Sequence, residues 1–279
     1  MELTALSWNL FHGRDHPPDP ALRTWRSRLL RFDERNETHI QVNRDLTGEF
    51  ATLLARAEWD VALLQECPPR FAAPLAAACR AESHLALTSR NSFRPLRALL
   101  ARQNPDLMAS GEGGSNLTLV RVPGRLGGIA ERRAIGIHEG LPERRSMAFV
   151  RTASGLCIAN LHATNDRPRL AAEDVLRAAR AACGWAAGSP LIFGGDLNLR
   201  PSEQPEIFER LREEFGLAPP TAPDAIDHIL CHGLEVLEPP ARWPAEQREL
   251  PFEGRALRLS DHAPVQARFE AAEPRALGN

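Results

Sequence analysis

Short apolar runs alternate with Gly-rich, Pro-rich or polar turns along most of the chain. Runs of roughly four to eight residues bounded by such turns are typical of strands. They predict strands at Leu3–Leu10, Asp60–Glu66, His84–Thr88, Asn116–Val122, Arg132–Ile137, Ser146–Arg151, Leu156–His162, Leu191–Phe193, Ala225–Cys231 and Ala263–Phe269. The middle strands follow one another through short turns, which favours antiparallel sheet over a βαβ repeat.

Other segments space their apolar residues as a helix does. This spacing predicts helices over Thr38–Arg56, Ala72–Ala81, Pro95–Gln103, Arg169–Ala187 and Glu203–Phe215. For the fourth of these, the expected inner face consists of Ala172, Leu176, Ala179 and Cys183. The Arg-rich stretch Thr24–Asn36 is expected to form a surface helix or an ordered loop, Ser110–Ser115 a loop, and Glu235–Arg248 an irregular segment.

The stretch Leu191–Pro201 reads LIFGGDLNLRP and joins an apolar strand to a polar end. We expect Gly194 and Gly195 to turn the backbone sharply and to deliver Asp196 and Asn198 to the mouth of the sheet. Two polar residues on alternate positions of an extended segment point the same way, so both can reach one metal ion or phosphate. The alternative is that Asp and Asn are ordinary turn residues.

The same pattern recurs elsewhere, because polar residues end or interrupt five other apolar runs. They are Asn9, Glu66, His162, Asp227, and Asp261 with His262. Oxygen donors gathered at one sheet edge suit a hard cation such as Mg²⁺ or Mn²⁺, and no Cys/His pair at short spacing supports structural zinc. A histidine paired with an aspartate supplies a base near neutral pH. Together they predict metal-assisted phosphoester hydrolysis.

Composition narrows the class of protein without deciding its substrate. With 279 residues, 43% of them hydrophobic, the chain can bury one large α/β core, and we expect a single domain over residues 1–270 with a frayed tail at 271–279. The 34 basic residues are all arginine and nearly balance 36 acidic ones, so bulk charge neither indicates nor excludes a nucleic-acid partner. Five scattered cysteines predict free thiols. Without a leader or an apolar span, we expect a soluble cytoplasmic protein with no membrane span.

Six short motifs, taken in order, resemble those of the endonuclease/exonuclease/phosphatase superfamily, which includes deoxyribonuclease I. They are Trp8-Asn9, Gln65-Glu66, NLHATND at Asn160–Asp166, GDLN at Gly195–Asn198, IDHIL at Ile226–Leu230 and SDH at Ser260–His262. The resemblance implies an α/β fold, a four-layer sandwich in which two mostly antiparallel sheets pack face to face with helices outside.

The resemblance also implies roles for individual residues. Glu66 would hold the metal, with help from Asn9 and Asp261. His262, oriented by Asp227, would be the general base on the attacking water, although members of the superfamily differ on whether the residue corresponding to His262 or to Asp196 takes the proton. The remaining residues would act on the phosphate: Asp196 and Asn198 would position the nucleophile and phosphate, and His162 would donate a hydrogen bond to the phosphoryl oxygens.

Two features depart from the superfamily pattern. The span between Asn9 and Glu66 is longer than in minimal members, and its Arg-rich insertion could form a substrate lid or a partner surface. In deoxyribonuclease I-like members, a carboxylate from an earlier strand pairs with the histidine that corresponds to His162, and here the nearest candidate is Asn116. Arg144 and Arg145 are the expected phosphate contacts.

The leading hypothesis is a metal-dependent phosphodiesterase that acts on nucleic acid. The first alternative is a hydrolase of a small phosphoester, such as an inositol phosphate or a phospholipid head group. A compact pocket capped by the insertion at residues 14–35 would favour this alternative. The second alternative is an inactive binding module, which the many buried polar residues disfavour because each is costly to keep.

Overall fold

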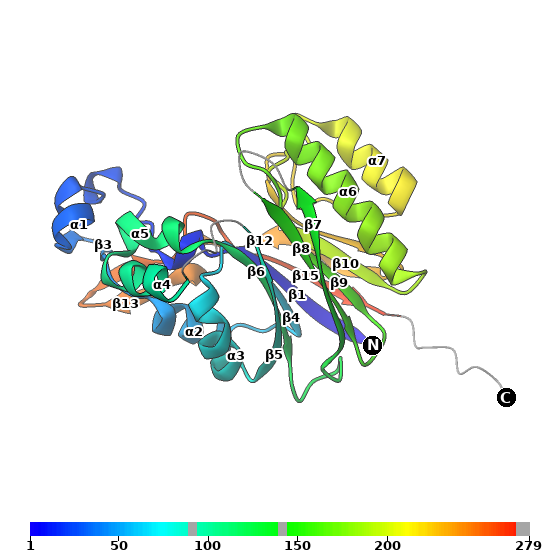
Figure 1. Cartoon of the computed structure of the whole chain (residues 1–279), viewed down its shortest axis with the longest axis horizontal. Coiled ribbons are helices and arrows are strands. Elements are labelled where there is room, and N and C mark those ends of the chain that lie inside the picture. The colour runs from blue at the N-terminus through cyan, green and yellow to red at the C-terminus, as the bar shows by residue number, and fades with distance from the viewer. Residues whose placement is uncertain (89–93, 139–143, 272–279) are drawn as a thin grey trace.

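Two large sheets form the centre of the molecule (Figure 1). The computed structural model describes residues 1–88, 94–138 and 144–271. The first sheet has the strand order β12-β15-β1-β4-β6-β5, and the second has the order β11-β10-β9-β8-β7. Within the sheets, β1 pairs in parallel with β4 and β9 with β10, whereas every other neighbouring pair in these sheets is antiparallel.

The strand bounds agree with most of the expected runs. The first sheet comprises β1 Glu2–Asn9, β4 Val61–Gln65, β5 Ala81–Leu87, β6 Ser115–Arg121, β12 Glu235–Arg242 and β15 Val265–Glu270. The second comprises β7 Ile129–His138, β8 Arg145–Thr152, β9 Cys157–His162, β10 Leu191–Asp196 and β11 Asp227–His232. Two short hairpins pair β2 Glu34–Arg35 with β3 Ile40–Gln41 and β13 Glu249–Phe252 with β14 Arg255–Arg258.

Helices α2 Thr47–Arg56 and α3 Ala72–Cys79 cover the outer face of the first sheet, and α6 Pro168–Ala186 and α7 Pro205–Phe215 cover that of the second (Figure 1). Helices α1 Trp25–Leu30, α4 Arg94–Gln103 and α5 Pro105–Glu112 lie together at one end of the molecule. Apolar residues between the sheets, such as Val61 and Ile192, form one buried cluster. A second cluster joins α6 and α7 to the second sheet, and a third joins α2 and α3 to the first. The four-layer α/β sandwich is therefore confirmed.

Strand β10 continues through Gly194 and Gly195, which we expected to form a turn. Flanking strands approach too closely for any side chain there. A Cβ on Gly194 would lie 2.5 Å from the carbonyl oxygen of His228, and one on Gly195 would lie 1.9 Å from that of Leu161. The glycines thus allow β9 and β11 to pair tightly with β10 up to its last residue, Asp196.

Replacing Gly195 with Ala should lower the free energy of unfolding by about 3 kcal/mol, because the methyl group meets backbone that cannot move away and φ is +133°. Urea unfolding measures this loss. Gly155→Ala is the matched control: its φ is +86°, but no atom lies within 4 Å of the added carbon. It should cost only about 1 kcal/mol. Equal losses in the two variants would contradict the close-approach explanation.

Three irregular or helical expectations were wrong. Residues 235–242 form the edge strand β12, where Pro239 and Pro240 are tolerated because an edge strand has one unpaired side. Helix α5 extends through Glu112 across the expected loop, and Asn104 caps its start by accepting a hydrogen bond from the Leu107 amide. The helix expected from Thr38 begins only at Thr47, because the residues before it pair with β2.

The inner face of α6 also differs from the expected one. Its buried positions are Ala171, Asp174, Val175, Ala178, Ala179, Ala182 and Ala186. Of the expected residues, Ala179 is buried, whereas Ala172, Leu176 and Cys183 pack at the margin. Small alanines let the helix approach the sheet closely, so the larger Leu176 is left at the border.

The end of the described chain is anchored at Ala271. This residue is buried, and its amide donates a hydrogen bond to the Met1 carbonyl oxygen at 2.9 Å. The rest of the expected tail, 272–279, lies outside the described residues. All five cysteines are free thiols. No helix in the described part of the chain has the length and apolar character needed to span a bilayer.

Candidate active site

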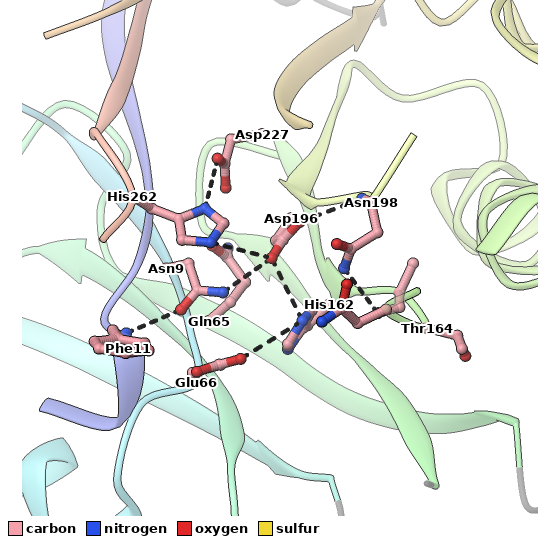
Figure 2. Close-up of polar contacts among 12 residues, drawn as sticks. Asn9, Phe11, Gln65, Glu66, His162, Thr164, Asp196, Asn198, Asp227 and His262 are labelled. Carbon is pink, nitrogen blue, oxygen red and sulfur yellow. Dashed lines mark hydrogen bonds and ion pairs between the residues drawn. The ribbon is translucent and has the colours of Figure 1, made fainter. Parts of the chain in front are cut away.

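The strand register brings the expected polar residues to one end of the sandwich. In the first sheet, Asn9 ends β1 beside the last residue of β4, and Glu66 follows directly with a φ of 45°. In the second sheet, His162 ends β9 beside Asp196, which ends β10 and pairs with Asp227 at the start of β11. Residues that are far apart in the sequence therefore point toward one another (Figure 2).

Buried amides hold the two sheets in register beneath the site. Asn9 donates its Nδ2 hydrogen to Asp196 Oδ2 at 2.9 Å, and Gln65 donates its Nε2 hydrogen to Asn160 Oδ1 at 2.8 Å. Each bond joins one sheet to the other. Gln65 and Asn160 were recognised only as parts of motifs, and the structure gives them this positioning contact.

His262 is clamped on both its ring and its backbone. Its Nδ1 lies 2.8 Å from Asp227 Oδ2, and its Nε2 lies 4.0 Å from Asp196 Oδ2. The His262 carbonyl oxygen accepts a hydrogen bond from the Trp8 indole at 3.0 Å, and its amide donates to the Ser260 hydroxyl at 3.1 Å. The ring is thus fixed with Nε2 facing the centre of the site.

The electrostatic surroundings favour the protonated form of His262. Burial by itself would lower the pKa of this imidazole, but the carboxylates of Asp227, Asp196 and Asp261 outweigh burial and raise it well above the ordinary 6.5. A carboxylate at 2.8 Å on Nδ1 also fixes the tautomer of the neutral ring, with its hydrogen on Nδ1 and a lone pair on Nε2. Neutral His262 can therefore accept a proton at Nε2.

Asp196 is the buried hub of the site. Its Oδ2 accepts the hydrogen bond from Asn9 and lies 3.4 Å from His162 Nε2. Burial, together with the nearby Asp227 carboxylate, raises its pKa to about 7. Asn198 also points toward this region, but not by strand alternation: β10 ends at Asp196, and Asn198 has a φ of 53°. Its amide nitrogen donates to the Ala163 carbonyl oxygen at 3.1 Å.

His162 is oriented by Arg145, whose NH1 lies 3.3 Å from His162 Nδ1. A guanidinium only donates, so His162 Nδ1 accepts and the ring hydrogen is on Nε2. Burial and the charge of Arg145 lower the pKa of His162 to about 3, which keeps the ring neutral. His162 is thus a neutral donor facing Asp196 and Glu66, from which Nε2 is 3.4 Å and 3.9 Å away.

The structure places Arg145 and Asn116 differently from the expectation, whereas the expected phosphate contact of Arg144 stays a prediction. Arg145 is buried, so it reaches the site through His162 and not as an exposed phosphate contact. Arg144 is exposed just before β8. The expected partner of His162, Asn116, instead donates to the Ser146 carbonyl oxygen at 2.7 Å. Arg145 therefore takes the place of the carboxylate that pairs with this histidine in deoxyribonuclease I-like members.

Glu66 meets a histidine that we did not anticipate. Its Oε2 lies 3.2 Å from His12 Nε2. Burial would raise the pKa of Glu66, but His12, His162 and His262 outweigh burial and lower it to about 2, so the carboxylate is ionised at any physiological pH. The signal for His12 was its position three residues after Asn9, where the chain leaves β1 in a short turn.

Acidic groups meet at the site, which fits a bound divalent cation. Burial, and after it the Asp227 carboxylate, raises the pKa of Asp196, and Asp227 Oδ1 is buried without a hydrogen-bond partner among the described residues. Asp196, Asp227 and His262 each offer a ligand atom, all within 4.8 Å of one another. Because His262 Nδ1 is already hydrogen-bonded to Asp227, these three residues are better suited to act as a general base and the carboxylates that position it than as metal ligands.

Glu66 and Asn9 are better suited to hold Mg²⁺ or Mn²⁺, because both ions prefer oxygen ligands. Glu66 offers an ionised carboxylate. Within the described residues, Asn9 Oδ1 accepts one hydrogen bond, from the Phe11 amide at 2.9 Å, which leaves it a second lone pair. The side chain of Asp261 is 32% exposed, and its Oδ1 lies 3.9 Å from His262 Nε2. Its expected role as a ligand stays a prediction.

If His262 is the base of the phosphoester hydrolysis expected from the sequence, the rate of that reaction should rise with pH through the neutral range. His262 accepts a proton only when neutral, and its carboxylate neighbours raise its pKa well above 6.5, so the active fraction grows as pH increases. The measurement is kcat/KM from about pH 5 to 9 at a saturating, fixed Mg²⁺ concentration. Asp227→Asn should move the rising limb to lower pH, because it removes a charge that raises this pKa. A pH-independent rate would contradict the assignment of the base.

Comparison with known proteins agrees with this architecture. Residues 6–262 match the group described as "Endonuclease/Exonuclease/phosphatase family". No curated protein matches significantly. One similar structure is an endonuclease/exonuclease/phosphatase family protein from Bacteroides thetaiotaomicron, with a TM-score of 0.64, 14% identity, and coverage of 100% of this chain and 99% of that one.

Two further solved structures share the fold. A mannosyl-6-phosphatase from Bacteroides thetaiotaomicron has a TM-score of 0.63 and 15% identity and covers 96% of this chain and 99% of its own. The human nocturnin catalytic domain has a TM-score of 0.60 and 14% identity, with coverage of 97% and 95%. Identities this low show the shared fold alone. The family match over most of the length shows that this chain belongs to the endonuclease/exonuclease/phosphatase family.

Proposed function

We propose that the protein is a divalent-metal-dependent phosphoester hydrolase in which His262 activates the attacking water. The observation that carries the proposal is the hydrogen bond that His262 Nδ1 donates to Asp227, which leaves Nε2 facing Asp196. In this scheme, neutral His262 takes a proton from water at Nε2, and Asp227 stabilises the imidazolium that forms. When bound, the cation neutralises charge on the phosphoryl oxygens.

The other residues bind and orient the phosphate. Neutral His162 carries its hydrogen on Nε2 and donates it to a phosphoryl oxygen. Asp196, held by Asn9, orients the attacking water between the phosphate and His262. Asn198 contributes a polar side chain on the same side (Figure 2). Glu66 and Asn9 hold the cation.

For the substrate, a cavity beside the site favours a compact phosphoester. It has a volume of about 250 Å³ and is lined by Phe11, Arg14, Arg23, Arg28 and Asp106, among others. Phe11 links it to the site, because its amide donates to Asn9 Oδ1. Most of the lining residues belong to the insertion of residues 14–35, and a compact pocket at this insertion supports the small-phosphoester alternative.

The arginines of this cavity suit an anionic substrate. The guanidinium of Arg14 lies over the Phe11 ring, 3.7 Å from its centroid, in the electrostatic field of both Glu66 and Asp106. Arg23 donates to His16 Nε2 at 2.6 Å. Planar guanidinium groups bind phosphate oxygens through paired hydrogen bonds. We therefore propose a small substrate that carries anionic oxygens besides those of the reacting phosphate.

Hydrolysis assays separate this proposal from the nuclease hypothesis. The substrates are p-nitrophenyl phosphate, bis-p-nitrophenyl phosphate, plasmid DNA and structured RNA, each with Mg²⁺, with Mn²⁺ and with EDTA. Metal-dependent turnover of the small esters, without cleavage of either nucleic acid, is expected. Cleavage of plasmid or RNA that EDTA abolishes would support the nuclease hypothesis instead. No metal-dependent turnover of any of the four would contradict both and favour the binding module.

A further inference from the structure

Helix α1 presents its apolar side chains to solvent. Trp25 is 66% exposed and Leu29 56%, and Phe32, just after the helix, is 52% exposed. The helical residue that faces inward is Ser27, whose hydroxyl donates to Gln41 Oε1. A surface helix of a folded domain normally turns its apolar side toward the core. Here the polar residue faces the protein and the apolar residues face out.

A second segment at the same end of the molecule is similar. In the described part of the chain, nine large hydrophobic side chains are exposed, and only Leu237 lies outside two segments, 25–32 and 96–107. Figure 1 shows α1, α4 and α5 together at the end away from the N-terminus. Asn104, between α4 and α5, donates to the Arg28 carbonyl oxygen at 2.8 Å and so ties the two segments together.

Positive charge accompanies this apolar surface. Residues 21–32 (ALRTWRSRLLRF) contain four arginines and no acidic residue, and residues 94–103 (RPLRALLARQ) contain three and none. The whole chain has a net charge of −2, so this concentration is local. Asp106 of α5 accepts a hydrogen bond from Gln41 at 2.8 Å and lines the cavity beside the site.

We propose that this end of the molecule, residues 21–32 with α4, docks onto a membrane surface that contains anionic lipids. Trp, Leu and Phe enter the boundary of the acyl chains, while arginines contact the anionic head groups through flexible stems. The exposed apolar residues of α1 point outward and line neither described cavity. They therefore suit a deformable lipid surface better than a protein partner that needs a complementary groove.

Docking would also bring the candidate substrate cavity close to the lipid head groups. Arg23, Thr24 and Arg28 line that cavity, while Trp25 and Leu29 of the same short segment face outward. Delivery of a lipid phosphoester to the cavity rests on the proposed function, but the docking itself does not.

The test is co-sedimentation of the full chain with vesicles, in EDTA so that no turnover contributes. The protein should bind vesicles of phosphatidylcholine mixed with phosphatidylserine, bind phosphatidylcholine alone weakly, and lose binding as salt rises. The double variant Trp25→Ser/Leu29→Ser should weaken binding by about tenfold or more. Arg26→Gln/Arg31→Gln should remove the preference for phosphatidylserine. None of these four residues belongs to the site or the cavity.

Matched controls lie on other surfaces. Leu237→Ser replaces the exposed leucine of β12, and Arg56→Gln replaces an exposed arginine of α2; both should bind vesicles as the wild type does. Unchanged turnover of bis-p-nitrophenyl phosphate by each variant checks folding, and the vesicle assay stands even without turnover. Absence of binding to mixed vesicles, or equal losses in the controls, would overturn the docking proposal.

Discussion

Replacing His262 with Ala should lower kcat/KM for phosphoester hydrolysis by about 10²- to 10⁴-fold, the usual contribution of a positioned general base. The ring is the group whose Nε2 faces the site while Nδ1 is held by Asp227 at 2.8 Å. Its removal leaves the water without a proton acceptor, but it leaves Glu66 and His162, the proposed phosphate donor, in place. Substrate binding should therefore change little, and the loss should appear mainly in kcat.

The control for His262 is His232→Ala, at the opposite end of β11 from Asp227. It should retain full activity. Asp227→Asn should lose nearly as much activity as His262→Ala, because an amide no longer fixes the tautomer or stabilises the imidazolium. The double variant should be no worse than His262→Ala alone, since the two residues act as one unit. Additive losses in the double variant would contradict this prediction, because they would show that Asp227 acts independently of His262.

Glu66→Gln should raise the Mg²⁺ or Mn²⁺ concentration needed for half-maximal activity by about 100-fold, as expected when a ligand or its support is lost. The carboxylate is ionised at neutral pH because His12, His162 and His262 hold its pKa near 2, so the wild type offers the cation a full negative charge. The substitution keeps the shape and removes that charge. Titration of activity against each metal, after EDTA treatment and dialysis, measures the change.

A matched control keeps the same chemical substitution away from the site. Glu58→Gln, on the surface after α2, should not alter the metal titration. High metal should restore much of the activity of Glu66→Gln, which separates loss of the cation from loss of folding. If the titration midpoint stays at the wild-type value while kcat falls, Glu66 does not hold the metal and its role is in the chemistry alone.

The apolar periodicity determined most of the fold, because local burial decides strand and helix positions. The runs at Leu3–Leu10 and Asp60–Glu66 became neighbouring strands β1 and β4, and the ordered motifs indicated the sandwich architecture. The same patterning failed where a neighbour, and not the local residues, decides the structure. Strand β10 continues through Gly194 and Gly195 because β9 and β11 pair with it there at close range.

For the site, the sequence determined which polar residues end the strands, since a buried carboxylate or amide at a strand end is costly without a partner. It could not determine their pairing. Arg145, predicted to contact phosphate, lies against His162 and orients it, and His12 was not predicted to approach Glu66. Distances of a few ångströms between residues more than a hundred positions apart, such as Asn9 and Asp196, arise only when the two sheets pack face to face. The sequence thus supplied the chemical groups, and the tertiary structure decided which of them share protons and charge.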